Sequence, residues 1–285
     1  MQIIDTHCHL NLEPLFSGLP GDFGENKTRH LSGKGWRDHW HAAKNNHVTK
    51  TIVIGVDPES SEKAILIARE ENQIFASVGI HPENLDKNLD SSRLTDLIQK
   101  NRQNVVAIGE VGLDYYFLDK TQPSFSQISL KQIELFTKQI SLAKELSLPL
   151  IIHSRDKDLP ETPEPNNAYW QVFSILDQAK LTQPFVLHCC SGPLSFIKAA
   201  LKLGAYIGIA GNVSYRNADH IRQIVGLTPA ERLLLETDAP YLPPNQDRGK
   251  ICEPWMIKNT ADYLQKEFGL DLDQIIVNAK RCFGI

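Results

Sequence analysis

Eight short apolar runs, separated by stretches with helical periodicity, most constrain the fold of this 285-residue chain. Short continuous apolar runs are typical of strands buried on both faces, and the amphipathic stretches between them predict covering helices. Eight such units in one chain predict an α/β protein with a closed (β/α)8 TIM barrel. The expected strands are Ile3–Thr6, Thr51–Val56, Ile74–Gly79, Val105–Gly109, Leu150–His153, Phe185–His188, Ala205–Ile209 and Leu233–Glu236.

The predicted helices alternate with these strands, and an open doubly wound sheet is the alternative to the barrel. No Gly-x-Gly-x-x-Gly follows the first strand, which disfavours a dinucleotide-binding form of the open sheet. Without repeats or a linker, we expect one domain over residues 1–285, with extended rim loops at 13–35 and 157–167. The expected helices are Trp36–Asn46, Ser60–Glu71, Leu130–Leu146, Tyr169–Lys180, Leu194–Leu203, Asp219–Val225, Glu253–Phe268 and Asp271–Cys282.

Composition indicates a cytoplasmic protein. No apolar run approaches the roughly 20 residues that span a bilayer, and the first residues enter a strand directly, so no membrane association is expected. The five cysteines form no CxxC pair, which favours reduced thiols. The net charge of −4 argues against broad adhesion to nucleic acid, but bound cations can still recruit phosphates. No obligate protein partner is inferred.

Titratable side chains follow the ends of several predicted strands. Because strand residues alternate between faces, His7 and His9 point the same way, and imidazoles are common metal ligands. In a parallel barrel all strand ends meet at one rim. Each residue alone has an ordinary explanation as a loop cap or hydrogen-bonded rim residue, but together they predict a metal site. The six residues are His7, His9, Glu110, His153, His188 and Asp238.

Four histidines and two carboxylates exceed the ligands of one tetrahedral ion. Two adjacent divalent ions that share a carboxylate are therefore expected, with Glu110 as the best bridge. Asp238 is placed to take a proton from water as a general base. Mg²⁺, Mn²⁺ and Zn²⁺ all remain open as the metal.

Five motifs follow one another in order along the chain. They are IDTHCHL (4–10), GIHP (79–82), AIGEVGLDY (107–115), LPLIIHSRD (148–156) and LETDAPY (235–241). These motifs resemble the signatures of the TatD family of metal-dependent deoxyribonucleases, and the resemblance runs from the first strand to the Asn278-Ala279 region.

The resemblance implies an amidohydrolase-like barrel that hydrolyses DNA with divalent metals, often as a 3′–5′ exonuclease. By position, His7, His9, Glu110 and Asp238 would hold one ion. Glu110 would share the second ion with His153 and His188. In this family a glutamate stands where many related barrels carry a carboxylated lysine, which agrees with Glu110 as the bridge.

Four further residues are expected to contact the substrate, which we expect to be DNA, with RNA or a small phosphoester as alternatives. Arg155 can donate hydrogen bonds to two oxygens of one phosphate, although a salt bridge to a neighbouring carboxylate would also account for an arginine at this position. His81 is expected near phosphate or behind a ligand, and Tyr115, followed by Tyr116, is expected to stack on a base or pack the rim. Arg248 belongs to a basic turn suited to a nucleic-acid backbone or to an ordinary solvated loop.

The chain also departs from the family pattern. Cys190 stands where the family usually has an aromatic residue, and Cys252 stands where it usually has Asn. The acidic, proline-rich stretch 157–167 would repel a long polyanion, which favours short ends or small phosphoesters.

Two other functions remain open. The same two-metal chemistry can hydrolyse a different ester or amide, such as an aminoacyl-nucleic-acid bond. A non-enzymatic scaffold that kept the fold is the third reading, and the intact set of six ligand positions weighs against it.

Overall fold

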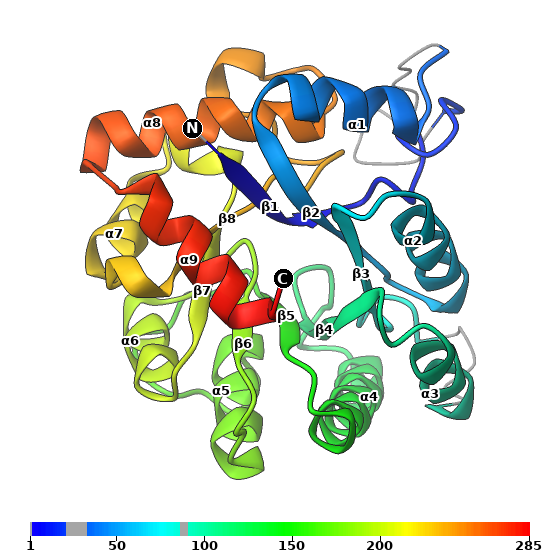
Figure 1. Ribbon diagram of the computed structural model, residues 1–285. Coiled ribbons are helices and arrows are strands. Elements are labelled where there is room, and N and C mark those ends of the chain that lie inside the picture. Colours follow the sequence, from blue (N-terminus) through cyan, green and yellow to red (C-terminus); the bar gives the residue numbers. More distant parts are fainter. Residues whose placement is uncertain (1, 21–32, 86–90) are drawn as a thin grey trace.

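The computed structural model describes residues 2–20, 33–85 and 91–285, and its strands form a parallel barrel (Figure 1). Within these residues the eight-stranded sheet follows the order of the chain, from β1 to β8. This topology confirms the predicted (β/α)8 TIM barrel. Part of the expected loop 13–35, residues 21–32, lies outside the described residues. The strands are β1 (Ile3–Cys8), β2 (Val48–Ile54), β3 (Ile74–Val78), β4 (Val105–Asp114), β5 (Leu150–Arg155), β6 (Phe185–Leu187), β7 (Tyr206–Ile209) and β8 (Leu233–Leu235).

The barrel closes between β1 and the segment that follows β8. The Asp238 amide donates to the His7 carbonyl at 2.8 Å, and the His9 amide donates to the Ala239 carbonyl at 2.7 Å. Closure therefore brings the end of β1 and the segment after β8 together at the rim where polar side chains gather.

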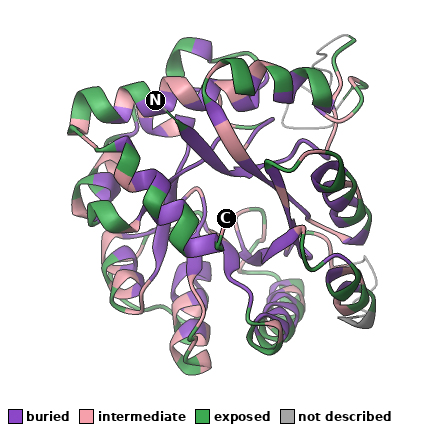
Figure 2. Cartoon of the chain, viewed as in Figure 1, coloured by how far each residue is buried: buried purple, intermediate pink, exposed green. Residues whose placement is uncertain are grey.

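Helices surround the barrel and bury one face against it. Figure 2 shows buried strands inside a ring of helices whose outer faces are exposed, as expected of amphipathic helices on a parallel sheet. Among the described helices, none is both long enough and apolar enough to cross a membrane. The helices are α1 (Trp36–Asn45), α2 (Pro58–Glu70), α3 (Ser91–Lys100), α4 (Pro123–Leu146), α5 (Ala168–Ala179), α6 (Leu194–Lys202), α7 (Asp219–Leu227), α8 (Ile257–Phe268) and α9 (Leu272–Phe283).

The last helix, α9, covers the end of the barrel opposite the polar rim. Its residues Ile276 and Phe283 belong to the same apolar cluster as Ile4 of β1 and Ile151 of β5. In Figure 1 the red α9 crosses in front of the strands. Because α9 and the apolar interior close this end, the cleft of the barrel lies at the carboxyl ends of the strands.

Several elements differ in bounds from the sequence-based expectation, and three differ most. Helix α3 was not predicted, although Leu94, Leu97 and Ile98 recur at helical spacing and pack against the core. Helix α4 begins at Pro123 rather than at residue 130, with proline in the first turn and Phe125 buried. Strand β4 continues to residue 114, so Glu110 lies within this strand rather than at its end.

The acidic stretch 157–167 is held by hydrogen bonds to its surroundings. The Trp170 indole donates to the Pro160 carbonyl at 2.9 Å, and the side-chain amide of Asn167 donates to the Asp158 carbonyl at 3.0 Å. The Glu161 carboxylate accepts from the Ser195 amide in the first turn of α6. These bonds tie the stretch to the outer helices.

Candidate metal centre

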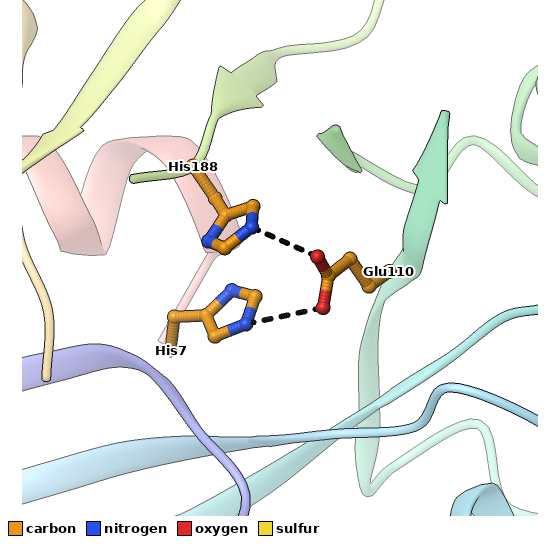
Figure 3. A group of neighbouring side chains, drawn as sticks. All are labelled: His7, Glu110 and His188. Atoms are coloured by element: carbon orange, nitrogen blue, oxygen red, sulfur yellow. Dashed lines mark ion pairs between the residues drawn. The ribbon is translucent and has the colours of Figure 1, made fainter. Parts of the chain in front are cut away.

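Glu110 lies at the centre of the polar side chains that the strands bring together. Its Oε2 is 3.4 Å from Nε2 of His7, and its Oε1 is 2.8 Å from Nε2 of His188 and 2.9 Å from Nδ1 of His153. Figure 3 shows the carboxylate with one oxygen directed at His7 and the other at His188. Each oxygen can therefore serve a different group of imidazoles.

The course of β4 places this carboxylate. The register between β4 and β5 shifts between Ile108 and Val111, and the Glu110 amide donates to the Gly55 carbonyl at 2.8 Å. Two residues further on, Gly112 has a φ of +144°, and an added Cβ would lie 1.9 Å from the His153 carbonyl oxygen. Only glycine permits this close approach of the two strands.

The first donor group consists of His7, His9 and Asp238. Their ligand atoms lie within 4.8 Å of one another, and Asp238 Oδ1 is 3.6 Å from His7 Nε2 and 3.4 Å from His9 Nε2. The other nitrogen of His9, Nδ1, lies 3.4 Å from the Ile54 carbonyl, so a proton there leaves Nε2 for a ligand.

Asp5 fixes this group from behind. Its carboxylate accepts hydrogen bonds from the Thr237 amide at 3.0 Å, the Thr237 hydroxyl at 2.7 Å and the His7 amide at 3.2 Å. Burial raises the pKa of Asp5 to about 8, against the opposing effect of the Thr237 hydrogen bonds. Asp5 thus joins the strand that carries His7 to the segment that carries Asp238.

The second donor group surrounds Oε1 of Glu110. It contains His153 and His188, whose facing nitrogens are 3.4 Å apart, and also His81, whose Nε2 is 3.5 Å from Oε1. Asp114 Oδ2 lies 2.9 Å from His153 Nε2. Asp114 engages Nε2, which leaves Nδ1, the nitrogen that faces Glu110, as the one that a metal ion would use, as carboxylates do for metal-binding histidines.

Glu236 stands behind His188. One of its oxygens accepts a hydrogen bond from the Cys189 amide and lies 3.6 Å from His188 Nδ1. The side chain is buried, and its other oxygen has no hydrogen-bond partner among the described residues. The Glu236 side chain therefore lies beside the ring nitrogen of His188 that does not face Glu110.

The charges of the cluster favour cations. Burial opposes ionisation of Glu110, but the neighbouring His188 and His81 hold the pKa of this carboxyl well below its usual range. Burial also disfavours a charged His153, yet hydrogen bonds to Asp114 and Glu110 raise its pKa to about 9. Ionised carboxylates therefore keep positive charge on His153, whereas burial lowers the pKa of His81 to about 3.

These residues fit a metal ion by their chemistry. Three triads of donors lie within 4.8 Å: His7 with Glu110 and His188, His7 with His9 and Asp238, and His81 with Glu110 and His153. In addition, the buried Nδ1 of His7 has no hydrogen-bond partner within the described residues. Imidazole and carboxylate donors suit Zn²⁺ and Mn²⁺, and the carboxylates also suit Mg²⁺.

The structure brings together all six residues that the sequence placed at the rim. It adds His81, which was expected near the substrate, and Asp114, whose role was missed although its motif was noted. The alternation of β4 contained a signal, because residues 110, 112 and 114 share one face of a strand. The predicted strand ended at residue 109, so this alternation was not applied to residues 110–114.

A cleft of about 680 Å³ opens beside the two donor groups. Arg155, predicted to bind phosphate, lines this cleft, and one of its terminal nitrogens is 4.0 Å from Asp114 Oδ2. Arg248 lies outside the lining, with its guanidinium over the Tyr215 ring. Within the described residues, the lining includes none of residues 157–167.

Of the two roles expected for Tyr115, stacking on a base and packing the rim, the structure shows the packing role. Its side chain is fully buried, packs edge-on against Phe125 and donates a hydrogen bond to the Gln171 side chain. The exposed aromatic residue of this loop is Phe117, which lines the cleft and was not predicted. A run of three aromatic residues in an irregular loop gives no periodicity from which to choose the outward one.

Comparisons with known proteins agree with this geometry over almost the whole chain. The sequence profile described as TatD related DNase matches residues 4–284. The uncharacterized metal-dependent hydrolase YabD of Bacillus subtilis is 30% identical over 288 residues, which cover 99% of each chain. The uncharacterized metal-dependent hydrolase YcfH of Escherichia coli K12 is 34% identical over 276 residues, covering 96% of this chain and 91% of YcfH. The crystal structure of YjjV, a TatD homologue from E. coli K12, matches with a TM-score of 0.80 and 26% identity, covering 99% of this chain and 98% of YjjV.

Proposed function

The chain belongs to the TatD-related DNase family and is a metal-dependent hydrolase, and on this premise we propose that it is a deoxyribonuclease acting from the 3′ end. The observation that carries the proposal is the position of Glu110, with one carboxylate oxygen toward His7 and the other toward His153 and His188. This arrangement suits two divalent ions that share one carboxylate, with Mg²⁺, Mn²⁺ or Zn²⁺ as the candidates.

Divalent ions in such a cluster would stabilise negative charge on phosphoryl oxygens and lower the pKa of nearby water. Their binding residues would be His7, His9, Glu110 and Asp238 for one ion, and Glu110, His153 and His188 for the other.

Asp238 is the proposed general base. Burial opposes its ionisation, but a hydrogen bond from His9 and the charge of nearby His188 keep its pKa below the usual range. The side chain lines the cleft, so an ionised carboxylate faces the position where water would attack phosphorus. Asp238 would take a proton from that water and return it to the leaving 3′ oxygen.

Arg155 is the proposed phosphate ligand. Its side chain is 43% exposed at the carboxyl end of β5, and it lines the same cleft as Glu110. A guanidinium can hold two oxygens of one phosphate and so orient the scissile bond.

The size of the cleft supports the end of a chain as the substrate. Its volume of about 680 Å³ lies within the range of small-ligand sites, roughly 300–1,000 Å³. A terminal nucleotide therefore suits it better than a long duplex. An ester or amide on a small molecule would also enter such a space, so the alternative hydrolase is an outcome of the test below.

The test compares metal-stripped protein with protein given Mg²⁺, Mn²⁺ or Zn²⁺ on end-labelled single-stranded DNA. We expect metal-dependent shortening from the 3′ end that is lost in Glu110→Gln and retained in Glu134→Gln, an exposed carboxylate on α4. Asp238→Asn should reduce the rate by about 10²–10⁴-fold. Protein that binds metal but cleaves no DNA would reject the nuclease and favour the ester or amide hydrolase.

A further inference from the structure

From the loop after β4 we infer that Phe117, together with Arg155 and Tyr116, forms a subsite that stacks the nucleobase of the terminal nucleotide. We call these three residues the stacking cluster. The inference rests on the proposed function and names the part of the substrate that the cleft recognises.

Phe117 is the most exposed large apolar side chain in the described part of the chain, with 70% of its surface accessible. Most exposed apolar residues of a folded protein need no explanation, but this one also lines the cleft that contains Glu110 and His153. An accessible aromatic face beside a reacting centre is the feature that nucleic-acid enzymes use to stack a base.

Arg155 is held against the aromatic rings. Its Cζ lies 4.0 Å from the centroid of the Tyr116 ring and 5.1 Å from that of Phe117. The two rings are 5.0 Å apart and nearly perpendicular, at 83°. The guanidinium is therefore oriented by cation–π contacts and by Asp114 behind it, while its exposed part remains available to a phosphate.

The charge of the cleft limits how many phosphates it can hold. Among the described residues that line it, Arg155 is the one lysine or arginine, whereas Glu83, Glu110, Asp114 and Asp238 are acidic. Such a surface suits one phosphate beside the metal cluster and gives no cationic track for a long backbone. A sequence-independent contact with a base would then add to the binding energy, and Phe117 can provide it because every base has an aromatic face.

The alternative is a purely structural role, in which Phe117 only covers the Arg155 side chain. The two explanations differ in one respect, since a stacking role requires a base on the substrate and a covering role does not.

The experiment measures binding of a short single-stranded DNA with 2-aminopurine as its 3′-terminal base and phosphorothioate linkages that slow hydrolysis. The metal-loaded protein should quench the 2-aminopurine fluorescence through stacking. Phe117→Ala should abolish the quenching and weaken binding by about 5- to 150-fold, the value of one base–aromatic stack. Phe117→Trp should preserve both.

Two controls keep the result interpretable. Leu130→Ala removes another exposed apolar side chain, on α4 away from the cleft, and should change nothing. A DNA with an abasic 3′-terminal nucleotide should bind wild type and Phe117→Ala equally. Equal weakening for base-bearing and abasic ends, or quenching that survives Phe117→Ala, would overturn the inference.

The outcome separates the subsite from the proposed function. Quenching that depends on Phe117 in a protein without DNA hydrolysis would support the subsite and reject the nuclease. The opposite result is also informative. If Phe117→Ala hydrolyses DNA with a base-bearing 3′ end and DNA with an abasic 3′ end at the wild-type rate, and binds both as wild type does, the nuclease is supported and the subsite is rejected.

Discussion

At the scale of single residues, the site depends on side chains that orient the candidate ligands. Asp114 lies 2.9 Å from His153 Nε2, and Asp5 accepts hydrogen bonds from the His7 amide and from Thr237. Neither residue is among the six predicted ligands. Both hold a ligand so that little freedom is lost when a cation binds.

We predict that Asp114→Asn lowers metal affinity or hydrolytic rate by about 10–100-fold, because a neutral amide no longer orients and polarises His153. Isothermal titration with Mn²⁺ or Zn²⁺ and rates at saturating metal would measure both effects. Asp119→Asn changes an exposed carboxylate in the loop that follows β4 and serves as the control. Unchanged affinity and rate in Asp114→Asn would show that His153 keeps its orientation without this charge.

At the scale of elements, the close packing of adjacent strands determines the position of Glu236, the side chain that contacts His188 of the second donor group. Gly208 of β7 leaves room for Glu236, which follows β8. A Cβ on residue 208 would lie 2.3 Å from Glu236 Oε2 and 2.8 Å from Oε1. Since Glu236 is buried and accepts the Cys189 hydrogen bond, its carboxylate has little freedom to move aside.

Gly208→Ala is therefore expected to lower the free energy of unfolding by about 1–3 kcal/mol through overpacking. It should also weaken metal binding, because displaced Glu236 no longer faces His188. Gly226→Ala provides the matched control, since nothing lies within 4 Å of an added Cβ at this exposed position of α7. That control should be neutral or stabilising by up to about 1 kcal/mol. Urea denaturation of both variants gives the comparison, and a Gly208→Ala midpoint equal to that of wild type would refute the packing argument.

At the scale of the whole molecule, the candidate metal centre joins distant parts of the barrel. Its donors come from β1, β4, β5 and the segments after β1, β3, β6 and β8. A cation there would connect the first and last strands, which otherwise meet through backbone bonds such as Asp238 to His7. Metal binding should therefore stabilise the entire fold by mass action.

Removal of the metal is predicted to lower the melting temperature by about 5 °C, measured with metal at about 100 times its Kd and again after chelation. The Glu110→Gln variant should melt at the same temperature with and without metal. A wild-type melting temperature that does not respond to chelation would argue that the cluster holds no cation under these conditions.

The sequence alone determined the barrel and the rim at which its polar residues meet. Apolar runs separated by amphipathic helices are local patterns, and the position of His7, Glu110 or His188 relative to such a run can be counted along the chain. In a parallel barrel that position is enough to place a residue at the carboxyl rim. The shared direction of His7 and His9 likewise followed from the alternation of a strand.

Only the tertiary structure decided which neighbours support the rim and which face the cleft. The extension of β4 to Asp114 depends on pairing with β5. Tyr115 is buried because its ring packs against Phe125 and its hydroxyl bonds to Gln171, whereas Phe117 remains exposed. In each case the deciding interaction joins residues distant in sequence or lies in a segment without periodicity, so no local pattern contains it.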